Sequence, residues 1–356
     1  MKLIALVSLF VLGAAGAQTW ISPATHVHSE GGAQNSFPFG TTIVPFRYLQ
    51  IHDDVPAMTI AGMAFRHNAT NAVYPAHSVT LDAWVSTAAT PSVLANATFD
   101  LNHGPDKVQV ITNRTYSLPA SDPHRLPGEF ILDFPFDVPF VYAGGSLCWE
   151  VQVTAKTQTA NIFYDAMTGG GTSPALATSR GLAGCRSTGR TLTMTVNPTG
   201  PTDWANGTGS LNIAGSQLLA NGAVFHVLGF DTAFWTAVGV PLPAMIPTSD
   251  TAPSGTCTVY LDVLYVAPFT ATATGTVSIQ LPVPVSLPLV GLTAFSQIIG
   301  LDAAANPFGM TASQMAMHNW VGPFPAPACS RVSSSGSLGA TGGINVGVNT
   351  LITKFY

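Results

Sequence analysis

Few residues of this chain have the types and spacing that catalysis needs, and the clearest group is a set of three acids. Glu129, Asp133 and Asp137 lie on the same parity of an alternating segment, so a strand would present all three on one face. A pair of carboxylates is the machinery of a glycoside hydrolase. Acids on the wet face of a strand also prevent edge-to-edge pairing of sheets. We interpret these acids as solubility residues, with a secreted hydrolase that uses Glu129 as an alternative.

Three other groups carry side chains that metals prefer, and each has a simpler structural interpretation. The groups are His26, His28 and Glu30; His52, Asp53 and Asp54; and Asp100, Asn102 and Asp106. The first group would suit a transition metal, and the other two offer the oxygen ligands of calcium. We interpret the first as an N-terminal arm, the second as a strand-ending turn and the third as a capped hairpin turn. We therefore expect no catalytic residue, no metal and no cofactor, although a weak calcium site stays open.

The four cysteines, Cys148, Cys185, Cys257 and Cys329, predict two disulfides if the chain is exported. No two of them lie close in sequence, which argues against a zinc site. Of the three pairings, we favour Cys148–Cys185 with Cys257–Cys329, because a linker is expected between the two pairs. In the chain-entropy model each bridge would stabilise the fold by about 4 kcal/mol.

Trp84 is the best candidate for ligand binding in the sequence. It shares a strand parity with Thr80, Asp82 and Ser86. A tryptophan on an otherwise polar face can stack on a sugar ring and bury area at low entropic cost. The alternative is a tryptophan that a loop or another domain covers.

The first 17 residues have the pattern of a secretory signal peptide. Lys2 gives a basic start, residues 3–13 form an apolar run, and residues 15–17 supply the small side chains of a cleavage site. The run is shorter than the roughly 20 residues that span a bilayer. We expect a secreted or cell-surface protein with no transmembrane segment after signal removal. Sequons begin at Asn68, Asn96, Asn113 and Asn206, and their glycosylation stays open.

Composition excludes several classes of protein. Only 8% of the 356 residues are charged and 47% are hydrophobic, so the chain is not disordered. The net charge is −5 and the basic residues form no cluster, which argues against nucleic acid as a partner. The 34 glycines and 27 prolines favour short strands joined by turns.

The dominant hydrophobic period is two, which is typical of strands with one buried face. In residues 129–140 the large apolar side chains all share one parity. Pro135 and Pro139 cannot donate to a ladder, so this strand is expected at a sheet edge or with a bulge. The same alternation recurs along the chain, and residues 292–305 fit a helix and a strand equally well. The sequence therefore predicts an all-β fold with little helix.

A break in the alternation at residues 197–209 suggests two domains, with about seven strand candidates on each side. We expect two tandem β-sandwich domains, the first jelly-roll-like and the second immunoglobulin- or fibronectin-like. The expected division is a signal peptide at 1–17, a first domain at 18–188 and a second domain at 189–329. Residues 330–356 would form a C-terminal tail with a last strand.

Several segments resemble a set of two-domain secreted proteins from planctomycete-type bacteria. The segments are FRYLQIHD (46–53) with TIAGMAFR (59–66), FDLNHGPDKV (99–108), LGFDTAFW (228–235) with VPLP (240–243), and residues 281–313. Ile51 and His52 stand where the pattern of that set has an aromatic residue before the aspartate. The resemblance implies the architecture and export, and it implies no site residues.

Together these observations favour a secreted, non-catalytic β protein of the cell surface or extracellular matrix. A glycan-binding module or adhesin is the first alternative, with polysaccharide or other cell-surface proteins as partners.

Overall fold

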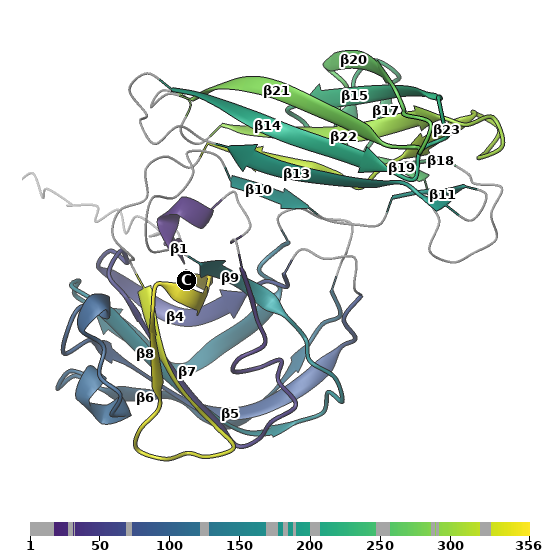
Figure 1. The fold of residues 1–356 in the computed structure, drawn as a ribbon. Helices are drawn as coiled ribbons and strands as arrows, with labels where there is room; N and C mark the ends of the chain where they lie inside the picture. The colour runs from purple at the N-terminus through teal and green to yellow at the C-terminus, as the bar shows by residue number, and fades with distance from the viewer. Residues whose placement is uncertain are drawn as a thin grey trace, which may run out of the picture.

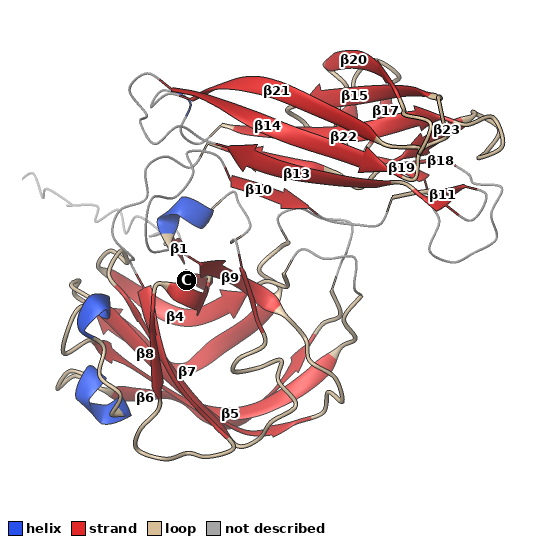
Figure 2. Cartoon of the chain, viewed as in Figure 1, coloured by secondary structure: helices blue, strands red, loops and turns tan. Residues whose placement is uncertain are grey.

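The protein is an all-β molecule, as the alternation predicts. The computed structural model describes residues 18–27, 31, 33–68, 73–121, 128–168, 177–180, 184–187, 190–199, 207–246, 257–285, 289, 292–320 and 329–356. Of the residues that the structure describes, 57% lie in strands, and no helix among them reaches seven residues. Figure 2 shows strands almost throughout, with only short helical turns between them. The expected signal peptide lies outside the described residues.

Two groups of strands form two lobes (Figure 1). The first lobe contains residues 20–168 together with 329–356. Its six-stranded sheet has the order β26 (Gly343–Val346), β25 (Cys329–Ser335), β3 (Phe46–His52), β8 (Leu147–Lys156), β5 (His77–Thr87) and β6 (Val108–Leu118). Its four-stranded sheet has the order β1 (Trp20–Ser22), β28 (Thr353–Phe355), β4 (Met58–Phe65) and β7 (Leu132–Tyr142). Its three-stranded sheet has the order β2 (Ala33–Asn35), β9 (Tyr164–Thr168) and β27 (Val348–Leu351).

Three short 3-10 turns also belong to the first lobe, namely η1 (Ala24–His26), η2 (Ser92–Leu94) and η3 (Phe99–Asn102). Side chains from the six- and four-stranded sheets meet in one core. Phe65 of β4 contacts Trp149 of β8, with ring centroids 5.7 Å apart. Phe39 stacks on Phe134 of β7 at 4.6 Å.

The second lobe contains residues 177–320. Its larger sheet has the order β10 (Ala177–Arg180), β24 (Ala316–Asn319), β22 (Thr293–Leu301), β15 (Ala223–Gly229) and β20 (Tyr265–Thr270), with β23 (Met310–Ala312) paired to β22. A three-stranded sheet has the order β13 (Thr193–Thr199), β14 (Gly207–Ser216) and β21 (Val277–Val285). Three ribbons complete it: β11 (Arg186–Ser187) with β12 (Arg190–Thr191), β16 (Phe234–Trp235) with β17 (Val240–Pro241), and β18 (Ala244–Ile246) with β19 (Cys257–Val259).

Most of the segment at 292–305, which fits a helix and a strand equally well, forms the central strand β22, and residues 303–305 form a turn after it. The expected linker at 197–209 differs from the structure at both of its ends. Residues 197–199 and 207–209 belong to β13 and β14, which pair with each other. The start of the break therefore lies within the smaller sheet of the second lobe, because the ladder with β14 continues through Asn197, Pro198 and Thr199.

β7 confirms the expectation drawn from its two prolines. It lies at the end of its sheet, and its pairing with β4 shifts between Ile60 and Gly62. Because Phe140 pairs with Ile60 and Pro135 with Gly62, the β7 residues between them bulge away from β4. Val138 is therefore 52% exposed although it has the parity of the core residues.

The last segment of the chain contains more structure than the expected tail with one strand. β25 pairs with β3 from Phe46 to His52, β27 pairs with β9, and β28 lies between β1 and β4. These strands complete all three sheets of the first lobe. Residues 177–180, which the expected division puts in the first domain, pair with β24 of the second lobe. Among the described residues, no helix is long and apolar enough to cross a membrane.

The expected disulfide pairing is wrong. Cys185 and Cys257 form a disulfide within the second lobe, with Cα atoms 4.5 Å apart, and Cys148 and Cys329 are free and buried. Cys148 pairs with Ile51 on one side of β3, and Cys329 pairs with His52 on the other side. Two strand spacings separate the two Cα atoms by about 10 Å, and successive residues of β3 face opposite sides of the sheet. The two thiols therefore cannot join, since a disulfide needs Cα atoms within about 7 Å.

Candidate functional site

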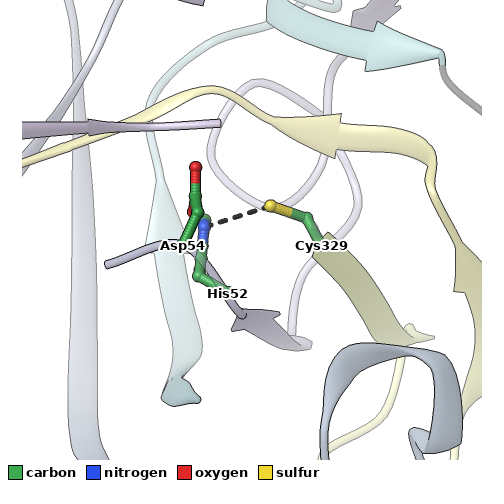
Figure 3. A group of neighbouring side chains, drawn as sticks. All are labelled: His52, Asp54 and Cys329. Carbon is green, nitrogen blue, oxygen red and sulfur yellow. Dashed lines mark hydrogen bonds between the residues drawn. The ribbon is translucent and has the colours of Figure 1, made fainter. Parts of the chain in front are cut away.

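The structure brings together His52, Asp54 and Cys329, with their ligand atoms within 4.8 Å of one another (Figure 3). His52 ends β3, and Cys329 begins β25 directly opposite it. Asp54 follows in the turn after β3, and the hydroxyl of Ser22 at the end of β1 contacts both His52 and Asp54. Sγ of Cys329 lies 3.3 Å from Nδ1 of His52. A thiol, an imidazole and a carboxylate would suit a zinc ion or a cysteine nucleophile with its base.

Hydrogen bonds fix which nitrogen of His52 carries the proton. Nε2 accepts N–H groups from Trp149 at 2.9 Å and from Gln50 at 3.0 Å. The Gln50 amide cannot turn over without loss, because it already donates to the carbonyl of Leu351 and accepts the Leu351 N–H. The neutral ring therefore carries its proton on Nδ1 and donates it to Ser22 Oγ at 2.7 Å.

With its proton on Nδ1, His52 is suited neither to zinc binding nor to activation of a cysteine nucleophile. A protonated Nδ1 has no lone pair for a metal ion or for a cysteine proton. Burial lowers the pKa of His52 to about 3, and burial raises the pKa of the Cys329 thiol well above its usual value. The ring and the thiol are therefore both neutral. The Ser22 hydroxyl, which accepts from His52, donates in turn to the carboxylate of Asp54. The group fastens β1 and the turn after β3 to the sheet.

A second group, which the sequence analysis missed, lies on the opposite face of the six-stranded sheet. Ser86 Oγ is 2.8 Å from Nδ1 of His103, and Nε2 of His103 is 3.0 Å from Oε2 of Glu150. The order of hydroxyl, imidazole and carboxylate is that of a serine hydrolase triad. However, Ser86 and Glu150 are both 0% exposed. The hydroxyl therefore has no surface that a substrate could reach in this structure, and the three side chains form a buried hydrogen-bond chain.

Glu150 is the centre of this second group. Arg47 Nε lies 2.7 Å from its carboxylate and Lys107 Nζ lies 3.6 Å away. Burial acts to raise the pKa of Glu150, but hydrogen bonds from His103 and Arg47 lower it to about 2. Arg47 and Lys107 also bind Asp100 of η3. The network therefore ties the η3 loop to the sheet, and it leaves the buried carboxylate fully paired.

Trp84, the ligand-binding candidate, is half-buried on the same face of β5 as Ser86. Its cross-strand neighbours are Gln109 of β6 and Glu150 of β8. Lys107 Nζ lies over the ring, 5.5 Å from its centroid. Asp82, two residues before Trp84, accepts a hydrogen bond from Gln109. The polar setting expected from the sequence is present, and one aromatic face already contacts a cation.

The three acids of residues 129–137 are not brought into one site. Glu129 precedes β7 and is exposed. Asp133 accepts a hydrogen bond from Tyr356, and Asp137 forms an ion pair with Arg114 at 3.0 Å.

Asp53 and Asp54 lie in the turn after β3, as expected, but Asp100 and Asn102 lie in the 3-10 turn η3 within the long connection from β5 to β6 and not in a capped hairpin turn. Asp53 accepts hydrogen bonds from the backbone and hydroxyl of Ser92, and Asp106 accepts them from Thr87. The Asn102 amide bonds the backbone of residues 96, 98 and 99. His26 is buried in η1, whereas His28 and Glu30 lie outside the described residues.

Local spacing could not have revealed the hydrogen bonds of either Ser–His–carboxylate group. The bonded side chains are 17 to 47 positions apart in the sequence, from Ser86 and His103 to His103 and Glu150. For the first group the sequence does carry a signal, because His52 and Asp54 belong to the set of three residues singled out as possible metal ligands. Comparison of the chain with family models, with curated proteins and with solved structures finds no match.

Proposed function

We propose that this protein is an exported, non-catalytic β protein of the cell surface or extracellular matrix, built from two β-sandwich lobes. One observation carries the proposal. Among the described residues, two groups combine a nucleophile, a histidine and a carboxylate. Their nucleophiles and histidines are buried, and their hydrogen bonds fasten strands and loops. The signal-like first 17 residues and the resemblance to secreted planctomycete-type proteins support export.

The test joins location and turnover. The protein is followed through cell fractions, and the purified chain is assayed on ester, peptide and glycoside substrates beside Ser86→Ala and Cys329→Ala. We expect recovery in the cell-surface or medium fraction and no turnover that either substitution abolishes. Turnover that is lost in Ser86→Ala or Cys329→Ala would disprove the non-catalytic assignment.

Glycan binding is a second candidate, and the setting of Trp84 favours it. The half-buried ring lies among side chains that can hydrogen-bond hydroxyl groups, namely Asp82, Gln109 and the partly exposed Gln152. A sugar ring stacked on the indole would replace the Lys107 contact and gain those hydrogen bonds.

Retention on a panel of polysaccharide columns tests this candidate. We expect retention by the native chain, its loss in Trp84→Ala, and its persistence in Trp235→Ala, which removes a half-buried tryptophan from the second lobe. Equal retention of the two variants, or no retention of the native chain on any polysaccharide, would exclude the Trp84 face as a glycan site.

A further inference from the structure

Among the described residues of the first lobe, three arginines are buried, and two of them have a carboxylate partner. Arg47 binds Glu150 at 2.7 Å, and Arg66 binds Asp165 at 2.7 Å. Arg331 of β25 is only 7% exposed, yet no carboxylate of the described residues forms an ion pair with it. A buried charge that lacks a partner destabilises the folded state. A negative charge beside Arg331 would remove this cost.

The groups that do contact Arg331 are neutral. Its Nε donates to the carbonyl of Val348 at 3.4 Å, and its guanidinium lies 5.8 Å from the ring centroid of Phe37. Its strand neighbours are Gln50 and Asn345. Its Nη1 is buried and has no hydrogen-bond partner.

Tyr48, whose phenol interacts electrostatically with Arg331, does not supply the charge. Burial raises the pKa of its phenol, and the field of Arg331 only partly opposes this. The phenol is therefore neutral, and its hydroxyl donates to Gln50 at 2.9 Å.

A second unsatisfied group lies on the neighbouring strand β27. Thr350 is 0% exposed, and its hydroxyl has no hydrogen-bond partner. It lies two residues beyond Val348, whose carbonyl Arg331 contacts, and β27 lies beside β25. A buried donor without a partner is rare in folded proteins and calls for a ligand atom or a bound water.

We propose that Arg331, together with the hydroxyl of Thr350, binds a small monovalent anion between β25 and β27. A halide ion and the carboxylate of a small organic acid share the chemistry that the site demands, which is one negative charge that accepts N–H and O–H donors. The burial of both side chains restricts the ligand to a small one. The bound anion would take the place that Glu150 and Asp165 hold beside the other two buried arginines.

The test compares anions at fixed ionic strength. Thermal unfolding of the full chain is followed in sodium chloride, sodium acetate and sodium methanesulfonate, whose anion is bulkier and coordinates weakly. The native chain is compared with Arg331→Met and with Arg114→Met, which removes an exposed arginine from β6. General salt effects are common to all three chains, so the difference between chains isolates the site.

We expect chloride or acetate to raise the midpoint temperature of thermal unfolding in the native chain and in Arg114→Met. The rise should be about 3 °C for each tenfold increase in anion concentration above the dissociation constant. Arg331→Met should show no such anion-specific rise. A response to chloride identifies a halide site, and a response to acetate alone identifies a carboxylate site. Equal midpoints of the native chain in all three salts, or an undiminished rise in Arg331→Met, would overturn the proposal.

A second measurement covers the case in which Arg331→Met does not fold. Crystals of the native chain grown in sodium bromide should give an anomalous peak within hydrogen-bond distance of Nη1 of Arg331, and Thr350→Val should weaken that peak. Density for water alone at this position, in bromide and in acetate, would refute the anion site.

Discussion

Burial lowers the pKa of four histidine side chains, His52, His67, His226 and His318, to between about 3 and about 4. In the unfolded chain these side chains titrate near pH 6.5. The unfolded state therefore binds more protons than the folded state between about pH 6.5 and pH 4. The four neutral histidines therefore cost no stability above this window. As the pH falls through it, the free energy of unfolding decreases.

His226 gives the sharpest test at this scale. It is 0% exposed, and neither ring nitrogen has a hydrogen-bond partner. Replacement by a ring of similar shape removes a buried polar group without orphaning another, so His226→Phe should leave stability at pH 7 within about 1 kcal/mol of the native value. At pH 5 the variant should resist urea better than the native chain by about 2 kcal/mol.

Urea unfolding at the two pH values measures both effects. His52→Phe is the matched control, because His52 accepts hydrogen bonds from Trp149 and Gln50 and donates to Ser22. It should lose stability at pH 7. If His226→Phe loses as much as His52→Phe at pH 7, then His226 has a polar partner and the assignment is wrong.

At the scale of elements, β3 separates the two free thiols. Each lies on a different side of that strand and on a different face of the sheet, so oxidation cannot join them without disrupting three strands. Burial also raises the pKa of both thiols well above the usual value, which keeps them protonated and unreactive.

Thiol titration checks this arrangement. Without reductant, the native chain should react with a thiol reagent slowly or not at all, and the chain in denaturant should expose two thiols. Mass mapping should place the disulfide between Cys185 and Cys257. Four thiols in denaturant would show that the disulfide is absent, and none would show that Cys148 and Cys329 are oxidised.

In the connection between β2 and β3, Gly40 lies directly against the backbone of Ile162. A Cβ atom at Gly40 would overlap the carbonyl of Ile162, which cannot move because the Ile162 N–H donates to Gly40. Gly40→Ala should therefore lower the free energy of unfolding by about 1–3 kcal/mol. Gly343→Ala in β26, where nothing lies within 4 Å of the added atom, should change it by less than about 0.5 kcal/mol. Equal effects of the two substitutions in denaturant unfolding would contradict this packing.

How far the sequence predicts these elements depends on the range of the contacts. The strands follow from local alternation: β5 alternates buried and half-buried residues along most of its length. In β8 the alternation predicts one buried face, but the first residues of the strand are buried on both faces. The outer face is covered by η3 through Phe99 and the Glu150 network. The disulfide and both Ser–His–carboxylate groups form only when distant strands pair, and no periodicity encodes which strands those are.

At the scale of the whole molecule, the second lobe is inserted into the first. The strands of the first lobe end with β9 and begin again with β25. Its core contains Leu351 and Phe355 beside residues from 39 to 166. The two lobes have separate clusters of buried side chains. Each cluster can therefore be completed without the side chains of the other lobe.

Deletion of residues 177–320 tests this nesting. The remaining chain keeps every strand of the three sheets of the first lobe. It should show β-type circular dichroism and a cooperative unfolding transition. Deletion of residues 329–356 instead removes two strands from the six-stranded sheet and one from each of the other two sheets, and it should leave a chain without cooperative unfolding. The nesting would be disproved if the first deletion abolished cooperativity and the second preserved it.

The pairing of β3 with β25 has a further consequence during synthesis. His52 and Cys329 are neighbours in the sheet but lie 277 positions apart in the chain. At roughly 5–20 residues per second, a ribosome needs some tens of seconds to make the missing partner. For that interval the early half of the lobe has an open sheet edge, which is a template for pairing with other chains. A nascent chain of this kind depends on a holding chaperone, or on prompt transfer in an unfolded state, until its last strands emerge.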